Sequence, residues 1–335
     1  ERAARDRVQA DVRLSFGQVT AGLRKTAALL ALAVMFTGCS APAESESGAA
    51  LPDVVGSMDI RYAEQFSVDY LADGSALAEV ADGRRYLIIP DGGEVPEHLP
   101  EDVTVISQPE NIYLASSSSM DLFSSLDCLG DILASSTPES GWKLPEIAQA
   151  MADEDILYAG KYSSPDIELL MSEGCDLAIE NMMIYHSPKT AEQIESCGIP
   201  VFIERSSAES HPLGRLEWVR LYGLMLGKSD EAEKFFSEKC SLLDEVTSRE
   251  STGCTAAFFY ISSNGSAVVR KPGDYISKMI ELAGGKYVFT AGDLNVDENA
   301  LSSANIQFEA FYALAKDADC LIYNGTVDGL SLIHI

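Results

Sequence analysis

Three short runs in the first third of the chain have the composition of β-strands. Residues 66–71, 76–81 and 84–89 are mostly apolar, and Asp-Gly pairs at 73–74 and 82–83 separate them. An Asp-Gly pair between two apolar runs is a strong signal for a tight hairpin turn. The pattern therefore predicts a small β-meander over residues 59–100.

From Val103 onward the pattern changes to short apolar runs that alternate with helix-like segments. Continuous apolar strands alternating with helices are typical of a parallel sheet that is covered on both faces. We therefore predict an α/β lobe over residues 101–211. Its expected strands are 103–107, 111–115, 131–135, 155–160, 176–181 and 199–204, and its expected helices are 120–129, one after Pro145, 165–172 and 188–196.

The longest helical periodicity runs over residues 215–249, with a break near Gly227. We expect Ser229 to cap a second helix there, because Asp230 and Glu231 follow it and favour the positive end of a helix dipole. Residues 212–250 are assigned to a helix that connects two domains.

A second α/β lobe is predicted over residues 251–335, with strands at 254–261 and 319–323 and helices at 275–283 and 308–316. The chain stops soon after the last strand, so we expect this lobe to be truncated. The predicted fold class is α/β, with two Rossmann-like lobes of mostly parallel sheets. Ligands of such sheets bind beyond the carboxyl ends of the strands, so the lobes are expected to face each other across one cleft.

The first 39 residues have the layout of an exported protein. Arg24 and Lys25 precede an apolar run over residues 26–36, which is too short for the ~20 residues that cross a bilayer. The following Thr37-Gly38-Cys39 resembles a bacterial lipobox, which implies that Cys39 carries a lipid. A secretory signal with an incidental cysteine is the alternative. Residues 40–58 read as a flexible tether, and residues 1–22 are given no role.

Charge and cysteine content narrow the function classes. The formal net charge of −28 repels nucleic-acid phosphates and anionic lipid headgroups, and it favours a soluble monomer. The seven cysteines form neither a CxxC pair nor a zinc-type spacing with histidine. We expect the six cysteines after Cys39 to be mostly buried thiols.

Sequence signatures of catalysis are absent. The chain contains no GxSxG elbow, P-loop or HExxH motif, and Gly284-Gly285 follows a predicted helix instead of opening one. We therefore expect a binding protein without a resident cofactor, and not an enzyme.

Five stretches together resemble a known family: residues 158–165, 174–180, 211–218, 273–276 and 283–287. This family comprises the ABC-importer solute-binding proteins with a rigid interdomain helix, which carry ferric siderophores, haem and cobalamin. The resemblance implies the class III periplasmic-binding-protein fold and an extracytoplasmic, lipid-anchored receptor. Its implied partners are a metal chelate and a permease with its ATPase. Family members dock on the permease through one exposed glutamate per lobe, which implies Glu168 and Glu309.

The expected ligand contacts lie at strand ends and in the turns that follow. In the first lobe they are Trp142, Lys161, Tyr162, Asn181, Met182 and Arg205, and in the second lobe Tyr260, Asn264 and Arg270. A loop tryptophan can stack on a flat ligand or fill a core. The two arginines can bind an anionic chelate or form surface salt bridges.

Two further features have a functional and a structural interpretation. Residues 116–119 are four serines before a predicted helix, so they could hold an anion or cap that helix. His186 and His211 could each ligate a metal, or end a turn and begin a helix.

The function that we predict is capture of a metal chelate, foremost a ferric siderophore, with haem or a corrinoid as other ligands. Two alternatives stay open. A receptor for free zinc or manganese would need more than the four histidines of this chain. A chelatase-like α/β enzyme would normally be cytoplasmic, against the export signal.

Overall fold

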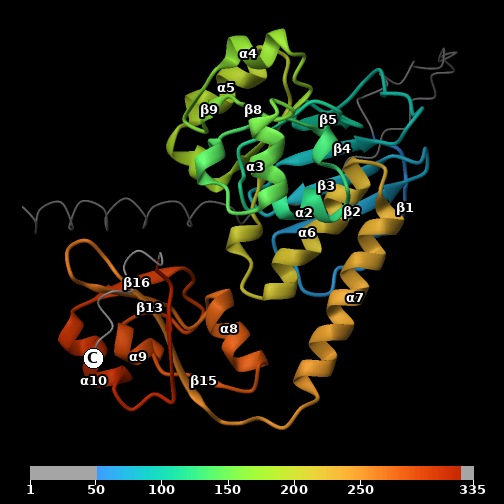
Figure 1. Cartoon of the computed structure of the whole chain (residues 1–335). Coiled ribbons are helices and arrows are strands. Elements are labelled where there is room, and N and C mark those ends of the chain that lie inside the picture. Colours follow the sequence, from blue (N-terminus) through green and yellow to red (C-terminus); the bar gives the residue numbers. More distant parts are fainter. Residues whose placement is uncertain (1–50, 326–335) are drawn as a thin grey trace, which may run out of the picture. The chain divides into compact units, whose positions relative to one another are not determined.

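The computed structural model describes residues 51–325 (Figure 1). The expectations for Cys39, for the signal segment and for residues 40–50 lie outside these residues. Within residues 51–325, no helix combines the length and the apolar character needed to cross a membrane.

The first sheet contains the predicted meander. Its strand order is β1-β2-β3-β4-β5, with antiparallel pairs from β1 to β4 and a parallel pair between β4 and β5. Gly74 and Gly83 form the two predicted turns with φ of 89° and 87°, which a side chain would strain. The strands are β1 (Val54–Ser57), β2 (Phe66–Leu71), β3 (Ala76–Val80), β4 (Arg85–Ile89) and β5 (Val103–Ser107).

Two segments of this sheet differ from the prediction. Val54–Ser57, expected in the tether, pairs with β2, and Val103–Ser107, expected in the first lobe, pairs with β4. The two segments are short, and the strand that each one pairs with is a tertiary property. Local composition therefore could not assign them.

The second sheet is fully parallel, with the order β12-β11-β6-β7-β8. Helices α2, α3 and α6 contribute to the core on one of its faces, and α4 and α5 to the core on the other. This arrangement confirms the predicted covering of both faces. The strands are β6 (Ile112–Leu114), β7 (Ile132–Ser135), β8 (Leu157–Tyr158), β11 (Leu177–Asn181) and β12 (Val201–Glu204). The helices are α2 (Met120–Ser125), α3 (Pro145–Ala152), α4 (Ile167–Ser172) and α5 (Pro188–Ser196).

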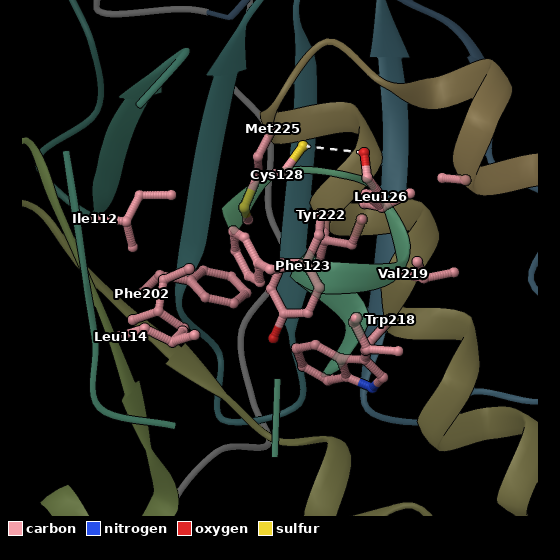
Figure 2. Packing of buried hydrophobic residues seen from close by; sticks show 14 of the residues in the cluster. Ile112, Leu114, Phe123, Leu126, Cys128, Phe202, Trp218, Val219, Tyr222 and Met225 are labelled. Carbon is pink, nitrogen blue, oxygen red and sulfur yellow. Dashed lines mark hydrogen bonds between the residues drawn. The ribbon is translucent and has the colours of Figure 1, made fainter. Parts of the chain in front are cut away.

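The predicted connecting segment forms two helices, α6 (Pro212–Met225) and α7 (Ser229–Thr247). Lys228 is the N-cap of α7 and no side chain caps it, so the prediction that Ser229 caps this helix was wrong. Asp230 and Glu231 lie in its first turn as expected. Figure 2 shows how Trp218 and Tyr222 of α6 pack with Phe123 and Phe202 in the main core.

Two buried glutamates fasten the meander to α6. Glu217 Oε2 accepts from the backbone N–H of Tyr62 at 2.7 Å and of Ala63 at 2.8 Å, and its Oε1 accepts from Arg61 at 2.9 Å. Glu209 accepts from the next two N–H groups, at 2.8 and 3.0 Å, and from Trp218 Nε1 at 3.0 Å. The backbone N–H groups of five consecutive residues, 61–65, therefore donate to two carboxylates.

The second lobe holds a mixed sheet. Strand β13 runs parallel to β15 and β17 and antiparallel to β14, which pairs antiparallel with β16. The tight turn between β13 and β14 requires an antiparallel pair. The strands are β13 (Thr255–Ile261), β14 (Ala267–Arg270), β15 (Lys286–Tyr287), β16 (Ser303–Ile306) and β17 (Cys320–Tyr323). The helices are α8 (Tyr275–Leu282), α9 (Ala291–Leu294) and α10 (Phe308–Ala315).

All six cysteines that the structure describes are free thiols. Burial was predicted correctly for Cys128, Cys175 and Cys240 and wrongly for three others. Cys197 is the C-cap of α5, Cys254 directly precedes β13, and Cys320 is the first residue of β17, and all three of these element ends are solvent-exposed. The exposed cysteines are Cys197, Cys254 and Cys320.

Gly223 allows α6 and α7 to approach closely, and this predicts the effect of enlarging it. A Cβ on Gly223 would lie 2.4 Å from Ala232 Cβ and 2.9 Å from Lys228 O. We expect Gly223→Ala to lower the free energy of unfolding by about 1–3 kcal/mol through overpacking. Urea unfolding followed by circular dichroism measures this. Gly130→Ala, whose added Cβ meets nothing within 4 Å, is the control. Equal stability of the two variants would contradict the packing argument.

Candidate ligand-binding site

The parallel sheet places four loops at one edge. Since β6, β7, β11 and β12 run in the same direction, the loops that follow them emerge together at their carboxyl ends. We call this edge the rim, and it comprises residues 115–119, 136–142, 181–186 and 205–208.

The carbonyl oxygen of Ala115 joins three of these loops. It accepts from Ser136 Oγ at 3.0 Å and from Asn181 Nδ2 at 3.1 Å, while Ala115 N donates to Ile179 O at 2.9 Å. Asn181 Oδ1 also accepts from Met183 N at 2.8 Å, which caps the short helix η3 (Met182–His186). Asn181, a predicted ligand contact, therefore holds the rim together with both ends of its amide.

The four serines of residues 116–119 divide into an inner and an outer pair. Ser116 and Ser119 are buried: Ser116 Oγ donates to Glu204 Oε2 at 2.8 Å, and Ser119 Oγ lies 2.9 Å from Tyr222 OH. Ser119 is the N-cap residue of α2 without a side-chain capping bond. Ser117 and Ser118 are exposed, so this outer pair is the part that can meet a ligand.

The four other predicted contacts of the first lobe differ in how far they are buried. Trp142 is half-buried against the main core, and its Nε1 donates to Thr137 O at 3.2 Å within its own loop. Tyr162 packs against the core under α4 and α5, whereas Lys161 in the neighbouring strand β9 (Gly160–Lys161) is exposed. Met182 is half-buried in η3. The indole of Trp142 is thus anchored at the rim.

Arg205 is the centre of a polar cluster that links the rim to the meander. Its Nε and Nη2 both donate to Gln65 Oε1 at 3.2 Å, and its Nη1 donates to Tyr185 OH at 3.0 Å. Tyr185 OH in turn donates to Asp82 Oδ2 at 2.6 Å. Burial, and then the hydrogen bond to Asp82, raise the pKa of Tyr185, so its phenol is neutral. Arg205 therefore has neutral direct partners, and it forms no salt bridge with any residue of the range 51–325.

The sequence did not reveal the two partners of Arg205, Gln65 and Tyr185, or Asp82, which bonds to Tyr185. Tyr185 lies four residues after the end of β11, close enough for strand-end reasoning to have included it. Gln65 and Asp82 come from the meander, and no local signal connects them to a strand end of another sheet.

The second-lobe candidates lie in and around the β13–β14 hairpin. Tyr260 is 39% exposed and pairs across the strands with Val268, so its side chain shares a sheet face with Arg270. Arg270 Nη1 lies 3.7 Å from Asp274 Oδ2, which matches the salt-bridge alternative. Asn264 Oδ1 accepts from Ser262 Oγ at 2.6 Å and from Ser266 N at 3.1 Å, so its side-chain oxygen shapes the turn. A shared cleft with the rim stays a prediction.

The two candidate histidines have structural surroundings. His211 Nδ1 accepts from Leu213 N at 3.1 Å at the start of α6, and its ring stacks on Tyr62 with centroids 4.7 Å apart. Burial, followed by the charge of Lys278, lowers the pKa of His211. His186 is exposed at the end of η3. Across residues 51–325, no three His, Cys, Asp or Glu side chains gather as a metal site.

The two predicted docking glutamates occupy equivalent helices. Glu168 lies exposed in the first turn of α4, and Glu309 lies exposed in the first turn of α10. Each helix leads to an aspartate just before a strand. Asp176 accepts from Glu110 N at 2.8 Å, and Asp319 accepts from Thr255 N at 2.8 Å. α10 has eight residues and α4 has six, so the segment from Glu309 to Asp319 is two residues longer than the segment from Glu168 to Asp176.

Comparison with curated sequences finds one distant relative. No family model matches the chain. The chain is 25% identical over 270 residues to the uncharacterized lipoprotein MJ0878 of Methanocaldococcus jannaschii, an alignment that spans 75% of this chain and 62% of that relative.

Several solved structures share the fold of this chain. A periplasmic binding protein of Veillonella parvula matches with a TM-score of 0.55 and 17% identity, over 70% of this chain and 78% of its own. The chain has the periplasmic-binding-protein fold. The haem-binding protein HutB of Vibrio cholerae (TM-score 0.53, 14% identity, 66% and 78% covered) and the petrobactin-binding protein YclQ of Bacillus subtilis (0.53, 12%, 74% and 76%) share this fold. All three are named as binding proteins, not as enzymes.

Glu180 is the unusual titratable group beside the rim. It precedes Asn181 on β11, is fully buried, and neither carboxylate oxygen has a hydrogen-bond partner among the described residues. Burial raises its pKa to about 8 from 4.5. Sequence reasoning passed over it as part of an apolar strand.

The raised pKa of Glu180 predicts a pH dependence of stability. The folded protein holds the proton of the Glu180 carboxyl more tightly than the unfolded chain does. The contribution of this proton to the free energy of unfolding is therefore complete below pH ~4.5 and is lost as the pH rises through about 8. The slope for this one group is about 1.4 kcal/mol per pH unit. In urea unfolding between pH 5 and 8, Glu180→Gln should lose this slope, and the exposed Glu192→Gln should keep it. If Glu180→Gln retained the wild-type slope, Glu180 would be ionised in the folded protein, against this prediction.

Proposed function

We propose that this chain is the extracytoplasmic solute-binding component of an ABC importer and that it captures a metal chelate. One observation carries the proposal: the periplasmic-binding-protein fold places a hydrogen-bonded rim at the carboxyl ends of a parallel sheet. Its loops are locked to one another through Ala115, Asn181 and Ser136. A rim that is already ordered binds a ligand without a further cost of ordering.

The rim chemistry supports a ligand with flat or apolar surfaces and anionic oxygens. Its exposed side chains include the hydroxyls of Ser117 and Ser118, the thioether of Met183 and the phenol of Tyr185. The guanidinium of Arg205 donates hydrogen bonds to the phenol of Tyr185 and to the amide of Gln65, and both of these groups are neutral. A ferric siderophore fits this combination, as do haem and a corrinoid. The names of HutB and YclQ, a haem-binding and a petrobactin-binding protein, support this ligand class.

The proposal includes anchoring and delivery. Cys39 would hold the protein to the outer face of the membrane through a lipid, which the lipoprotein name of the M. jannaschii relative supports. Glu168 and Glu309 would dock on cationic residues of the permease, whose ATPase then drives import. Their exposure on the first turns of equivalent helices supports this assignment.

Titration of tryptophan fluorescence with a panel of ferric hydroxamate, ferric catecholate, haem and cobalamin tests the ligand class. We expect one member to bind, and Arg205→Gln to weaken its binding about tenfold or more, since a hydrogen bond from a charged donor contributes ~1.5–3 kcal/mol. Arg249→Gln, at an exposed position just after the C-cap of α7, is the control. Tight binding of bare zinc in place of any chelate would refute the proposal.

Charge reversal of the two glutamates tests delivery. We expect Glu168→Arg with Glu309→Arg to abolish uptake of the radiolabelled chelate and to leave its dissociation constant near the wild-type value. The pair Glu192→Arg and Glu238→Arg makes the same change in net charge at exposed positions of α5 and α7. Normal uptake by the first double variant would remove Glu168 and Glu309 from docking.

A further inference from the structure

An exposed apolar side chain lies one helical turn after each of the two equivalent glutamates. Met171 follows Glu168 by three residues and is 55% exposed, and Tyr312 follows Glu309 by three residues and is 60% exposed. Residues three apart lie on neighbouring positions of a helix surface. Each helix therefore presents a carboxylate and a large apolar group side by side.

The two helices agree at three positions. Counted from the N-cap, Asp166 in α4 and Gln307 in α10, the glutamate is the second helical residue. The fourth residue is buried in both helices, as Leu170 or as Phe311, and it holds the helix on its sheet. The fifth residue is the exposed apolar one. The two lobes thus repeat one surface pattern in helices of different length.

The exposed pair is distinguished by its recurrence. A single exposed apolar residue is ordinary on a protein surface. Met171 and Tyr312, however, recur at the same helical position in both lobes, beside the same acidic residue. Leu170 and Phe311 are the residues by which α4 and α10 pack on their cores, and Met171 and Tyr312 stay on the exposed side.

We propose that Glu168 with Met171 and Glu309 with Tyr312 are two copies of one docking element. In each copy the carboxylate pairs with a cationic residue of the permease, and the apolar side chain enters an adjoining recess. This inference rests on the proposed function and adds Met171 and Tyr312 to the docking surface. Desolvated apolar or aromatic anchors beside charge pairs are the usual sources of binding energy in an interface.

The repetition also defines the form of the partner. Two copies of one element require a partner that offers the same cationic, recessed site twice. A symmetric dimer presents identical surfaces in that way. The partner is therefore a permease whose two subunits each receive one lobe.

Photo-cross-linking in the native membrane identifies the partner. A benzoylphenylalanine probe is placed at position 171 or 312 of the full chain, with Leu242 (55% exposed, α7) and Met279 (49% exposed, α8) as control positions. We expect an ABC permease subunit, identified by mass spectrometry, from positions 171 and 312 only. Equal cross-linking from the controls would overturn the inference.

Binding to the purified permease–ATPase complex measures the energetic contribution. Met171→Ser and Tyr312→Ser should each raise the dissociation constant about tenfold, with unchanged thermal midpoints, whereas Leu242→Ser and Met279→Ser should not. If both anchor variants bind like wild type while Glu168→Arg with Glu309→Arg does not bind, the inference fails and the proposed function stands. If the wild-type chain binds neither the complex nor any chelate of the panel, the proposed function fails.

Discussion

The acceptance of five consecutive backbone N–H groups by Glu209 and Glu217 is the constraint on which the site depends. A buried carboxylate is costly unless donors surround it, and residues 61–65 supply those donors from the chain just before β2. The clamp leaves no room for a side chain at Gly214, where a Cβ would lie 2.7 Å from Tyr62 O. It fixes the meander on α6, and so it also fixes Gln65 and Asp82, which position Arg205 and Tyr185.

The meander is consequently a part of the lobe. Residues of β2, β3 and β4 belong to the same core cluster as β6, α2 and α6, and Phe66 contacts Trp218 edge to face at 4.9 Å. Both sheets pack on this one cluster. The turn at Asp82 and the loop at Arg205 are therefore held in fixed positions relative to each other, although they are far apart in the sequence. The rim therefore forms as the lobe folds, before any ligand arrives, and binding energy need not be spent on ordering it.

The sequence predicts what depends on local patterns and misses what depends on long-range pairing. Hydrophobic periodicity and turn residues gave the meander, the parallel strands and the break near Gly227. Val103–Ser107 was placed in the wrong sheet, because nothing local shows that β4 is its partner. For the same reason strand-end reasoning found Arg205 but not Gln65 or Asp82. Glu180 escaped notice, since burial of an acid without a partner is a tertiary outcome.

The two candidate arginines, equal at the level of sequence, differ in what their charge can do. Arg270 lies 3.7 Å from the carboxylate of Asp274, which offsets much of its charge. Arg205 donates to an amide oxygen and a phenol, and the nearest carboxylate in that cluster, Asp82, bonds to the phenol and not to the guanidinium. Arg84 lies 3.6 Å from Asp82 and offsets that carboxylate further. In a chain with a net charge of −28, a cation held by neutral groups is what an anionic chelate would be drawn to. Arg205, in the first lobe, is therefore the charged contact that we propose for such a ligand.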